Sequence, residues 1–241
     1  MRPPRVLGSL LYALFQLIVT PLFAIVSLAT FPLPLAARYR VISHWARMMV
    51  KAADLLCGIR YRVVGRDNIP DEPCIILANH QSAWETFCFQ LIFPPQVWVL
   101  KRELLWIPFF GWGLAMLAPI AIDRGSGARA LRQTYEQGKD RLARGFWIVI
   151  FPEGTRTAPG EQRPYQSGGA WLATKTGAKV VPVAHDAGRC WPRNAWLKRP
   201  GTITVKIGAP IAPEGMSVDE LGTRVEHWIR SEVKALEHDH A

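Results

Sequence analysis

The chain has 241 residues, a length that suits one α/β domain with an accessory segment. Its formal net charge of +10 is unevenly spread, because the residues up to Arg66 hold nine Lys or Arg against one acid, whereas the remainder is nearly balanced. A nucleic-acid-binding protein would carry a basic face and a recognisable motif on its folded domain, so we expect no nucleic acid among the partners. With 49% apolar residues and ten Trp, the composition instead indicates a bilayer, whose anionic headgroups would attract the basic N-terminal part.

Residues 6–37 contain no charged side chain. One straight helix over this stretch would be about 48 Å long, against a hydrocarbon core of about 30 Å. Pro21 lies near its middle and is expected to break or kink the helix, which would leave two halves of about 22 Å each. We therefore predict a membrane-embedded helical hairpin that enters one leaflet, or one tilted and kinked span.

Arginines flank this apolar segment on both sides, with Arg2 and Arg5 before it and Arg38, Arg40 and Arg47 after it. Such symmetric flanks give no inside–outside preference, so we expect both ends to face the cytoplasm. A cleaved signal peptide is the weaker alternative, because its apolar region usually has only about 7–15 residues. The sequence thus predicts anchoring through the N-terminus at the cytoplasmic face of the inner (plasma) membrane.

Between residues 41 and 56, apolar side chains recur at helical spacing, while Arg40, Arg47 and Lys51 fall on another face. This basic amphipathic helix suits the surface of an anionic bilayer, and it suits equally a helix packed on the core of a domain. We assign residues 1–58 to N-terminal membrane-anchoring helices and residues 59–241 to an α/β domain.

A polar cluster follows the apolar run at residues 74–78, which is typical of a strand buried on both faces. His80 lies where this strand ends. Ser82 and Glu85 form an S-x-x-E capping pattern, so a helix is expected to begin at Ser82, with Glu85 in its first turn. A carboxylate there can reach back to His80, fix its tautomer and leave the other ring nitrogen free as a general base. The alternative is that Ser82 and Glu85 only cap a helix.

Residues 104–117 crowd large apolar side chains into a stretch that is too short to span a bilayer and is interrupted by Pro108, Gly111 and Gly113. This stretch either forms an interfacial lip beside the active site, which would suit a substrate that resides in the membrane, or packs beside the sheet. A smaller interfacial patch of aromatic and basic residues is expected from Trp191, Trp196, Lys198 and Arg199.

A second polar cluster follows another apolar run, at residues 146–151, and contains Glu153, Gly154, Thr155 and Arg156. In an open α/β sheet, ligands bind beyond the carboxyl ends of the strands. The turn offers backbone N–H groups, a hydroxyl and a planar guanidinium there, and these groups suit a phosphate. The alternative is a surface turn with a solvated arginine.

Strands and helices alternate along the domain, which predicts an α/β fold with a mostly parallel sheet flanked by helices. Strands are expected at residues 61–64, 74–78, 97–100, 120–122, 147–151, 179–183 and 202–207. Helices are expected at residues 84–91, 128–144, 167–176 and 218–236.

Four sequence blocks within residues 60–210 resemble, in the right order, the 1-acylglycerol-3-phosphate acyltransferase family, the glycerolipid acyltransferases with an H-x-x-x-x-D motif. The blocks are Asn79–Glu85, Lys101–Arg124, Phe151–Arg156 and Val180–Val183. The family's usual Asp is Glu85 here, so the longer side chain requires a slight shift of the helix start.

The resemblance implies that His80 takes the proton from the free hydroxyl of a lysophospholipid as that oxygen attacks an acyl thioester, while Glu85 orients His80 and stabilises the imidazolium. It implies that Lys101 and Arg156 bind the acceptor's phosphate, with Arg124 as a further candidate.

The resemblance also assigns secondary roles. Glu153 and Thr155 would shape the turn or touch the acceptor's glycerol, and Val180–Val183 would line the acyl or donor side. Backbone N–H groups near Gly154 would stabilise the thioester oxyanion.

The product implied is phosphatidic acid, made by acylation of the sn-2 hydroxyl for phospholipid biosynthesis. The expected partners are a lysophospholipid acceptor, an acyl-CoA or acyl carrier protein donor and the bilayer, with no further cofactor. The four cysteines, Cys57, Cys74, Cys88 and Cys190, lack C-x-x-C or zinc spacing, so no metal is expected. Two alternatives stay open, an O-acyltransferase for another lyso-lipid such as lyso-ornithine lipid, and a non-catalytic membrane scaffold.

Overall fold

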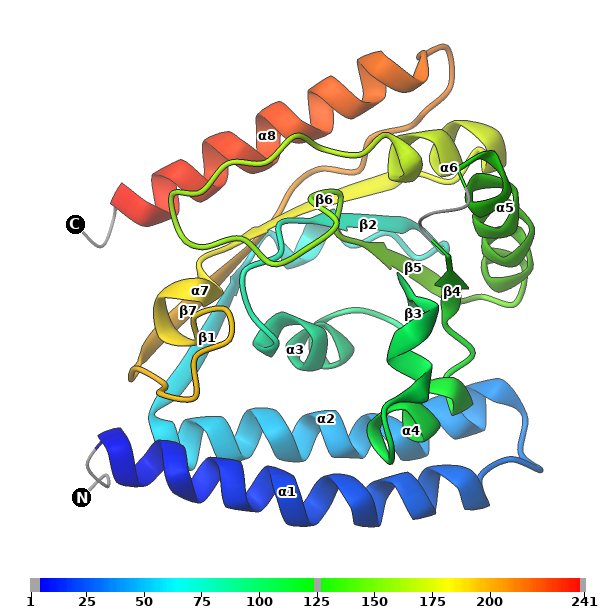
Figure 1. Ribbon diagram of the computed structural model, residues 1–241. Helices are drawn as coiled ribbons and strands as arrows, with labels where there is room; N and C mark the ends of the chain where they lie inside the picture. The colour runs from blue at the N-terminus through cyan, green and yellow to red at the C-terminus, as the bar shows by residue number, and fades with distance from the viewer. Residues whose placement is uncertain (1–4, 124–126, 239–241) are drawn as a thin grey trace.

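Seven strands form one sheet in the computed structural model, which describes residues 5–123 and 127–238 (Figure 1). The strand order is β1-β7-β6-β2-β5-β3-β4, and every neighbouring pair is parallel except β6 and β7. The strands are β1 Ile59–Val64, β2 Ile75–Ala78, β3 Gln96–Lys101, β4 Ile120–Ile122, β5 Trp147–Ile150, β6 Val180–His185 and β7 Gly201–Ile207. This arrangement confirms the predicted α/β class with a mostly parallel sheet.

Helices cover both faces of the sheet (Figure 1). The helices of the domain are α3 Trp84–Ile92, α4 Phe110–Met116, α5 Ala128–Ala143, α6 Gly168–Thr176, α7 Ala187–Cys190 and α8 Val218–His238, with 3-10 turns η1 Arg66–Asn68 and η2 Arg102–Trp106. Helices α5, α6 and α8 lie on one side of the sheet, and α3 lies on the other. Every predicted strand and helix is present with ends within two residues, whereas α4 and α7 were not predicted.

The N-terminal hairpin differs from the predicted one. Helix α1, Arg5–Ala29, runs unbroken through Pro21, and its antiparallel partner is α2, Leu35–Cys57. Pro21 removes a single backbone hydrogen bond, and packing against α2 and α4 compensates for that loss. The bend lies instead at residues 30–34, where the Arg38 guanidinium donates to the carbonyls of Phe31 and Leu33 at 2.6 and 2.8 Å.

Helix α2 packs on the domain, which confirms one of its two predicted placements. Its residues Ile42, Ala46, Met49 and Ala53 are buried in the same hydrophobic core as the sheet. Helix α1 lies outside α2 and leaves most of its apolar side chains exposed, Leu17 at 72% for example. Among the described residues, α1 is the one helix long and apolar enough to cross a bilayer.

The start of α1 is fixed to the domain by a buried lysine. The ammonium group of Lys198 lies 4.8 Å from the ring centre of Tyr12 and 4.5 Å from that of Trp191, in cation–π contact with both. Trp191 and Lys198 are therefore buried beneath α1, so the predicted interfacial patch is wrong for these two residues. Trp196 and Arg199 of the same patch are exposed.

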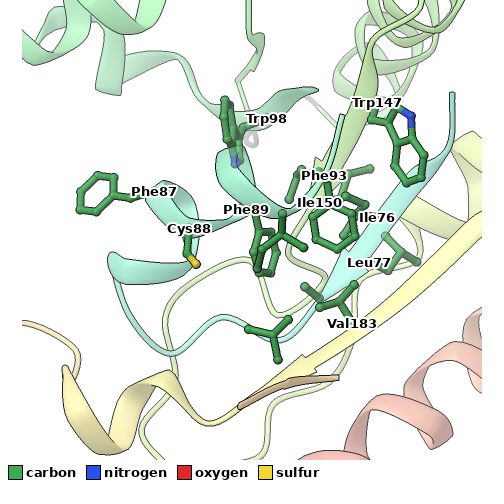
Figure 2. Packing of buried hydrophobic residues seen from close by; sticks show 14 of the residues in the cluster. Ile76, Leu77, Phe87, Cys88, Phe89, Phe93, Trp98, Trp147, Ile150 and Val183 are labelled. Atoms are coloured by element: carbon green, nitrogen blue, oxygen red, sulfur yellow. The ribbon is translucent and has the colours of Figure 1, made fainter. Parts of the chain in front are cut away.

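The core determines where the polar loops leave the sheet. Strands β2, β5 and β6 are buried along their whole length, and Phe89 of α3 and Phe93 directly after it pack over Ile76 and Ile150 (Figure 2). Burial of each such side chain contributes about 1.5–3 kcal/mol. Because β2, β5 and β6 are parallel and in register, the loops that follow them leave the sheet at the same edge.

Candidate active site

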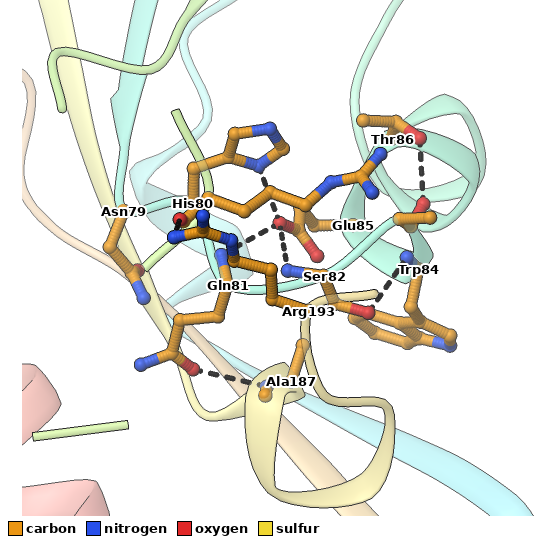
Figure 3. A network of polar contacts seen from close by, with 12 residues as sticks. Asn79, His80, Gln81, Ser82, Trp84, Glu85, Thr86, Ala187 and Arg193 are labelled. Atoms are coloured by element: carbon orange, nitrogen blue, oxygen red, sulfur yellow. Dashed lines mark hydrogen bonds and ion pairs between the residues drawn. The ribbon is translucent and has the colours of Figure 1, made fainter. Parts of the chain in front are cut away.

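His80 and Glu85 lie between β2 and the first turn of α3 and contact each other directly. Nδ1 of His80 is 2.7 Å from Oε1 of Glu85, and the same oxygen accepts the backbone N–H groups of Gln81 at 3.0 Å and Ser82 at 2.8 Å (Figure 3). Because a carboxylate only accepts hydrogen bonds, Nδ1 carries a proton, and in the neutral imidazole this leaves Nε2 as the acceptor. The longer side chain of Glu85 therefore permits the predicted contact.

The helix that carries Glu85 begins later than the capping pattern predicts and at the start of the predicted range 84–91. It starts at Trp84 rather than Ser82, and the Ser82 hydroxyl accepts the N–H of Trp84 at 3.1 Å. Glu85 nevertheless accepts the N–H of Ser82, as in a capping box. The Glu85 carboxylate thus caps the helix and contacts the His80 imidazole at the same time. Capping and orientation of His80 are therefore compatible roles for this residue.

Glu85 is fully buried and remains ionised. Burial raises the pKa of its carboxyl, but the nearby His185 and His80 and the N–H of Ser82 outweigh burial and hold the pKa below its ordinary value. Nε2 of His185 lies 4.0 Å from Oε1 of Glu85 and donates to the carbonyl of Asn79 at 2.8 Å. Burial lowers the pKa of His185, so that ring is neutral at pH 7. We therefore attribute the low pKa of Glu85 mainly to its hydrogen bonds rather than to a second ion pair.

The loop after β5 holds the backbone of His80. Oε2 of Glu153 accepts the N–H of His80 at 2.8 Å, and the N–H of Thr157 donates to the His80 carbonyl at 2.7 Å. The ring of Phe151 stacks on the imidazole, with ring centres 4.0 Å apart. His80 is thereby fixed at its ring, its N–H and its carbonyl by two different loops.

Glu153 faces His80 rather than the substrate space. It does not line the cavity described below, and its described hydrogen bonds join it to His80 and Thr157. Burial raises the pKa of its carboxyl to about 7, partly offset by the hydrogen bond from His80.

Gly154 turns the chain at a φ of 71°, which favours glycine. Its N–H donates to the carbonyl of Phe151 at 3.0 Å. That N–H is therefore engaged within the turn, and the use of other backbone N–H groups near Gly154 for an oxyanion stays a prediction.

A cavity of about 500 Å³ lies over His80. Its polar end contains His80, Lys101, Gly154, Thr155 and Arg156, which are thus brought together from the ends of β2, β3 and β5. Its apolar wall is formed by side chains of α1, α2, α3, β3 and α4 with neighbouring residues, including Phe23, Ala24, Ile42, Trp45, Phe87, Trp98, Phe109, Phe110 and Leu114. One end of the cavity therefore suits an anion and the other an acyl chain.

The stretch at residues 104–117 borders this cavity, as predicted for a lip. Leu104, Phe109 and Leu114 line it, while Trp106 is 71% exposed on the outside. By contrast, Val180–Val183 lies in the central strand β6 and contributes no lining residue to this cavity, so its place on the acyl or donor side stays a prediction. Arg124 lies outside the described residues. Within the described ranges, no group of three His, Cys, Asp or Glu side chains is placed to hold a metal ion.

Sequence reasoning missed one cation of the cavity, Arg193. It lies between α7 and β7 and lines the cavity, and its Nη1 donates to the carbonyl of Arg156 at 2.7 Å. The only signal in the sequence was its position shortly after the fourth block of the resemblance, which is too weak to place a side chain.

Comparisons with known proteins agree with this geometry. A family model described as Acyltransferase matches residues 60–186. The chain is 48% identical over 201 residues to the 1-acyl-sn-glycerol-3-phosphate acyltransferase of Pseudomonas aeruginosa, covering 82% of this chain and 78% of that protein. It is 31% identical over 195 residues to the protein of the same name from Saccharomyces cerevisiae, covering 77% of this chain and 63% of that protein.

A solved structure is also similar. The crystal structure of the 1-acyl-sn-glycerophosphate (LPA) acyltransferase PlsC from Thermotoga maritima superposes with a TM-score of 0.80 at 26% identity, covering 95% of each chain. The similarity extends over the N-terminal helices as well as the sheet. From its sequence, its fold and its His80-centred site, the chain belongs to the acyltransferase family that includes the 1-acyl-sn-glycerol-3-phosphate acyltransferases.

Proposed function

We propose that the protein transfers an acyl chain from a thioester to the sn-2 hydroxyl of 1-acylglycerol-3-phosphate and so makes phosphatidic acid. The observation that carries this proposal is the oriented His80–Glu85 pair at the polar end of a cavity whose other wall is apolar. The names of the relatives in Pseudomonas aeruginosa and Saccharomyces cerevisiae support the same reaction.

His80 acts as the general base in this proposal. Its Nε2 accepts the hydroxyl proton while that oxygen attacks the thioester carbonyl, and Glu85 stabilises the imidazolium that forms. When the new C–O bond has formed and the C–S bond breaks, the imidazolium returns the proton to the leaving sulfur. No residue becomes acylated, because the thioester is already activated and the acceptor supplies the nucleophile.

Lys101 and Arg156 bind the phosphate of the acceptor at the polar end of the cavity. A guanidinium engages two phosphate oxygens at once, whereas an ammonium acts as a compact charge, so the two groups complement each other. The acyl chains extend along the apolar wall. The donor is acyl-CoA or acyl carrier protein, which both present the same thioester.

The protein works at the cytoplasmic face of the membrane. Exposed apolar side chains cover the outer side of α1, and further ones, including Trp106, Ile107 and Trp112, lie around the adjoining α4. Many exposed apolar side chains on adjoining helices are typical of membrane contact. Helix α1 is about 38 Å long, and packing along α2 favours an orientation in the plane of the interface for both helices.

Acyl transfer by the purified protein in mixed micelles tests the proposal. Oleoyl-CoA and then oleoyl-acyl carrier protein serve as donors for lysophosphatidic acid, and phosphatidic acid is measured by mass spectrometry. His80→Ala should lose nearly all turnover and still bind the acceptor, whereas His227→Ala, an exposed histidine on α8, should keep it. Full activity in His80→Ala would exclude the general-base role.

A further inference from the structure

Arg193 reaches the active-site cavity from the side opposite to Lys101. In the sheet, β2 with His80 at its end lies between β6 and β5, and β3 with Lys101 follows beyond β5. Arg193 belongs to the segment that leaves β6 through α7, and α7 is tied to the His80 loop because the N–H of Gly188 donates to Oε1 of Gln81 at 3.1 Å. The cavity thus receives Lys101, Arg156 and Arg193 from three different loops.

One short contact ties the exposed Arg193 side chain to the turn that also holds the backbone of His80. Its Nη1 donates to the carbonyl of Arg156 at 2.7 Å, and the next N–H along the chain, that of Thr157, donates to the carbonyl of His80 at 2.7 Å. Figure 3 shows the Arg193 side chain extending along the loop of His80, Gln81 and Ser82. Within the described residues Arg193 forms no ion pair, and the carboxylate of Glu161 nearby pairs with Arg163 at 2.8 Å.

The distance between the reacting atom and the phosphate in each substrate decides which phosphate the Arg193 guanidinium can bind. In the acceptor, the attacking oxygen and the phosphorus are separated by only a few covalent bonds of about 1.5 Å each. In the donor, the phosphate nearest the thioester lies at the far end of a long pantetheine arm. A cation anchored beside His80 is therefore within reach of the acceptor's phosphate and not of the donor's.

We propose that Arg193 is a third ligand of the acceptor's phosphate, beside Lys101 and Arg156, and that it makes the site selective for a phosphate monoester. This inference rests on the proposed function. A monoester carries a charge of about −1.5 to −2 at pH 7 and presents three terminal oxygens, enough for three cationic ligands. A phosphodiester head group carries a single charge and has its third position blocked by a substituent, so the third cation discriminates between these two classes of lyso-lipid.

The test compares Arg193→Ala and Arg193→Gln with the wild type, using lysophosphatidic acid and lysophosphatidylglycerol as acceptors and saturating oleoyl-CoA. Glutamine keeps an N–H donor for the Arg156 carbonyl and removes the charge. Both variants should raise KM for lysophosphatidic acid by about tenfold or more, as expected for a lost charged hydrogen bond. Their preference for the monoester over the diester should fall by a similar factor, with kcat and the KM for oleoyl-CoA little changed.

Arg199→Ala is the matched control, because Arg199 is exposed on the same loop and does not line the cavity. It should leave KM and the acceptor preference unchanged. An unchanged KM for lysophosphatidic acid in Arg193→Ala would overturn the inference. A rise confined to the KM for oleoyl-CoA would also overturn it, because Arg193 would then bind the donor. An equal loss of kcat with both acceptors would overturn it as well, because Arg193 would then only support the turn that contains Arg156.

Direct binding separates this inference from the proposed function. The probe is a lysophosphatidic acid analogue that lacks the sn-2 hydroxyl, titrated calorimetrically into each variant in micelles. Weaker binding to Arg193→Ala and Arg193→Gln than to the wild type and Arg199→Ala supports the inference even if no acyl transfer to lysophosphatidic acid occurs. Equal binding to all four proteins, or none to the wild type, overturns it.

Discussion

The backbone N–H of His80 donates to Oε2 of Glu153 at 2.8 Å, so the loop after β2 is held by a carboxylate from the loop after β5. A different carboxylate, Glu85, holds the imidazole ring of the same residue. The two groups differ in ionisation, because the pKa of Glu85 lies below its ordinary value and that of Glu153 is raised to about 7. Substitutions at the two positions should therefore have different consequences.

Glu153→Gln should change how stability depends on pH. The folded-state pKa of about 7 exceeds the ordinary value of 4.5, so the folded protein binds the proton more tightly. The stabilisation from this group is complete below about pH 4.5 and is lost as the pH rises through 7. The variant lacks this loss. Its free energy of unfolding should therefore rise relative to that of the wild type by up to about 3 kcal/mol between pH 5 and pH 8. Thermal unfolding in one detergent across this range checks the result, with Glu214→Gln, an exposed carboxylate, as the control. A constant difference at all pH values would contradict the raised pKa.

Glu85→Gln should reduce kcat by about 100-fold or more, because a neutral amide no longer requires the proton on Nδ1 of His80 and cannot stabilise the imidazolium. Glu85→Asp keeps the charge and shortens the reach of the 2.7 Å contact, so a smaller loss is expected. Single-turnover rates with saturating acceptor separate the two variants. Equal losses of kcat in Glu85→Gln and Glu85→Asp would show that the placement of the group at residue 85 matters more than its charge.

Leu17→Glu with Ile25→Glu should release the protein from vesicles that contain anionic lipid. Both side chains are exposed on α1, and a carboxylate at either position would oppose insertion into the hydrocarbon and would be repelled by anionic headgroups. Flotation on a density gradient measures the bound fraction. Leu131→Glu, an exposed apolar position on α5 away from this surface, should float like the wild type. Continued flotation of the α1 variant would place the membrane contact elsewhere.

Ala24→Phe should shorten the acyl chains that the enzyme accepts. Ala24 is a small buried residue of α1 that lines the apolar part of the cavity, so a ring there removes space for the end of a chain. The kcat/KM for a palmitoyl donor should fall by about tenfold, whereas that for a decanoyl donor should be retained. Ala29→Phe, an exposed alanine on the same helix that does not line the cavity, serves as the comparison. A parallel fall for both donors would mean that the cavity does not measure chain length.

Much of this protein was determined by the sequence itself. Apolar runs such as residues 74–78 and 147–151 predicted buried strands, because a strand that is buried on both faces is apolar at nearly every position. His80, Glu85 and Arg156 were identified because polar residues directly after such strands must emerge at one edge of a parallel sheet. These inferences depend only on the local order of apolar and polar residues, which the sequence contains.

Other features were decided only by tertiary structure. Pro21 remains inside one helix because α2 and α4 pack against the side of α1 that faces the domain, a contact that local propensity does not contain. Glu153 turns toward the backbone of His80, and Arg193 reaches Arg156 across 37 residues, because the sheet places their loops side by side. Periodicity records which face of an element is apolar, but it carries no information about which distant loop that element will meet. The contacts that complete the site therefore arise only when the chain folds.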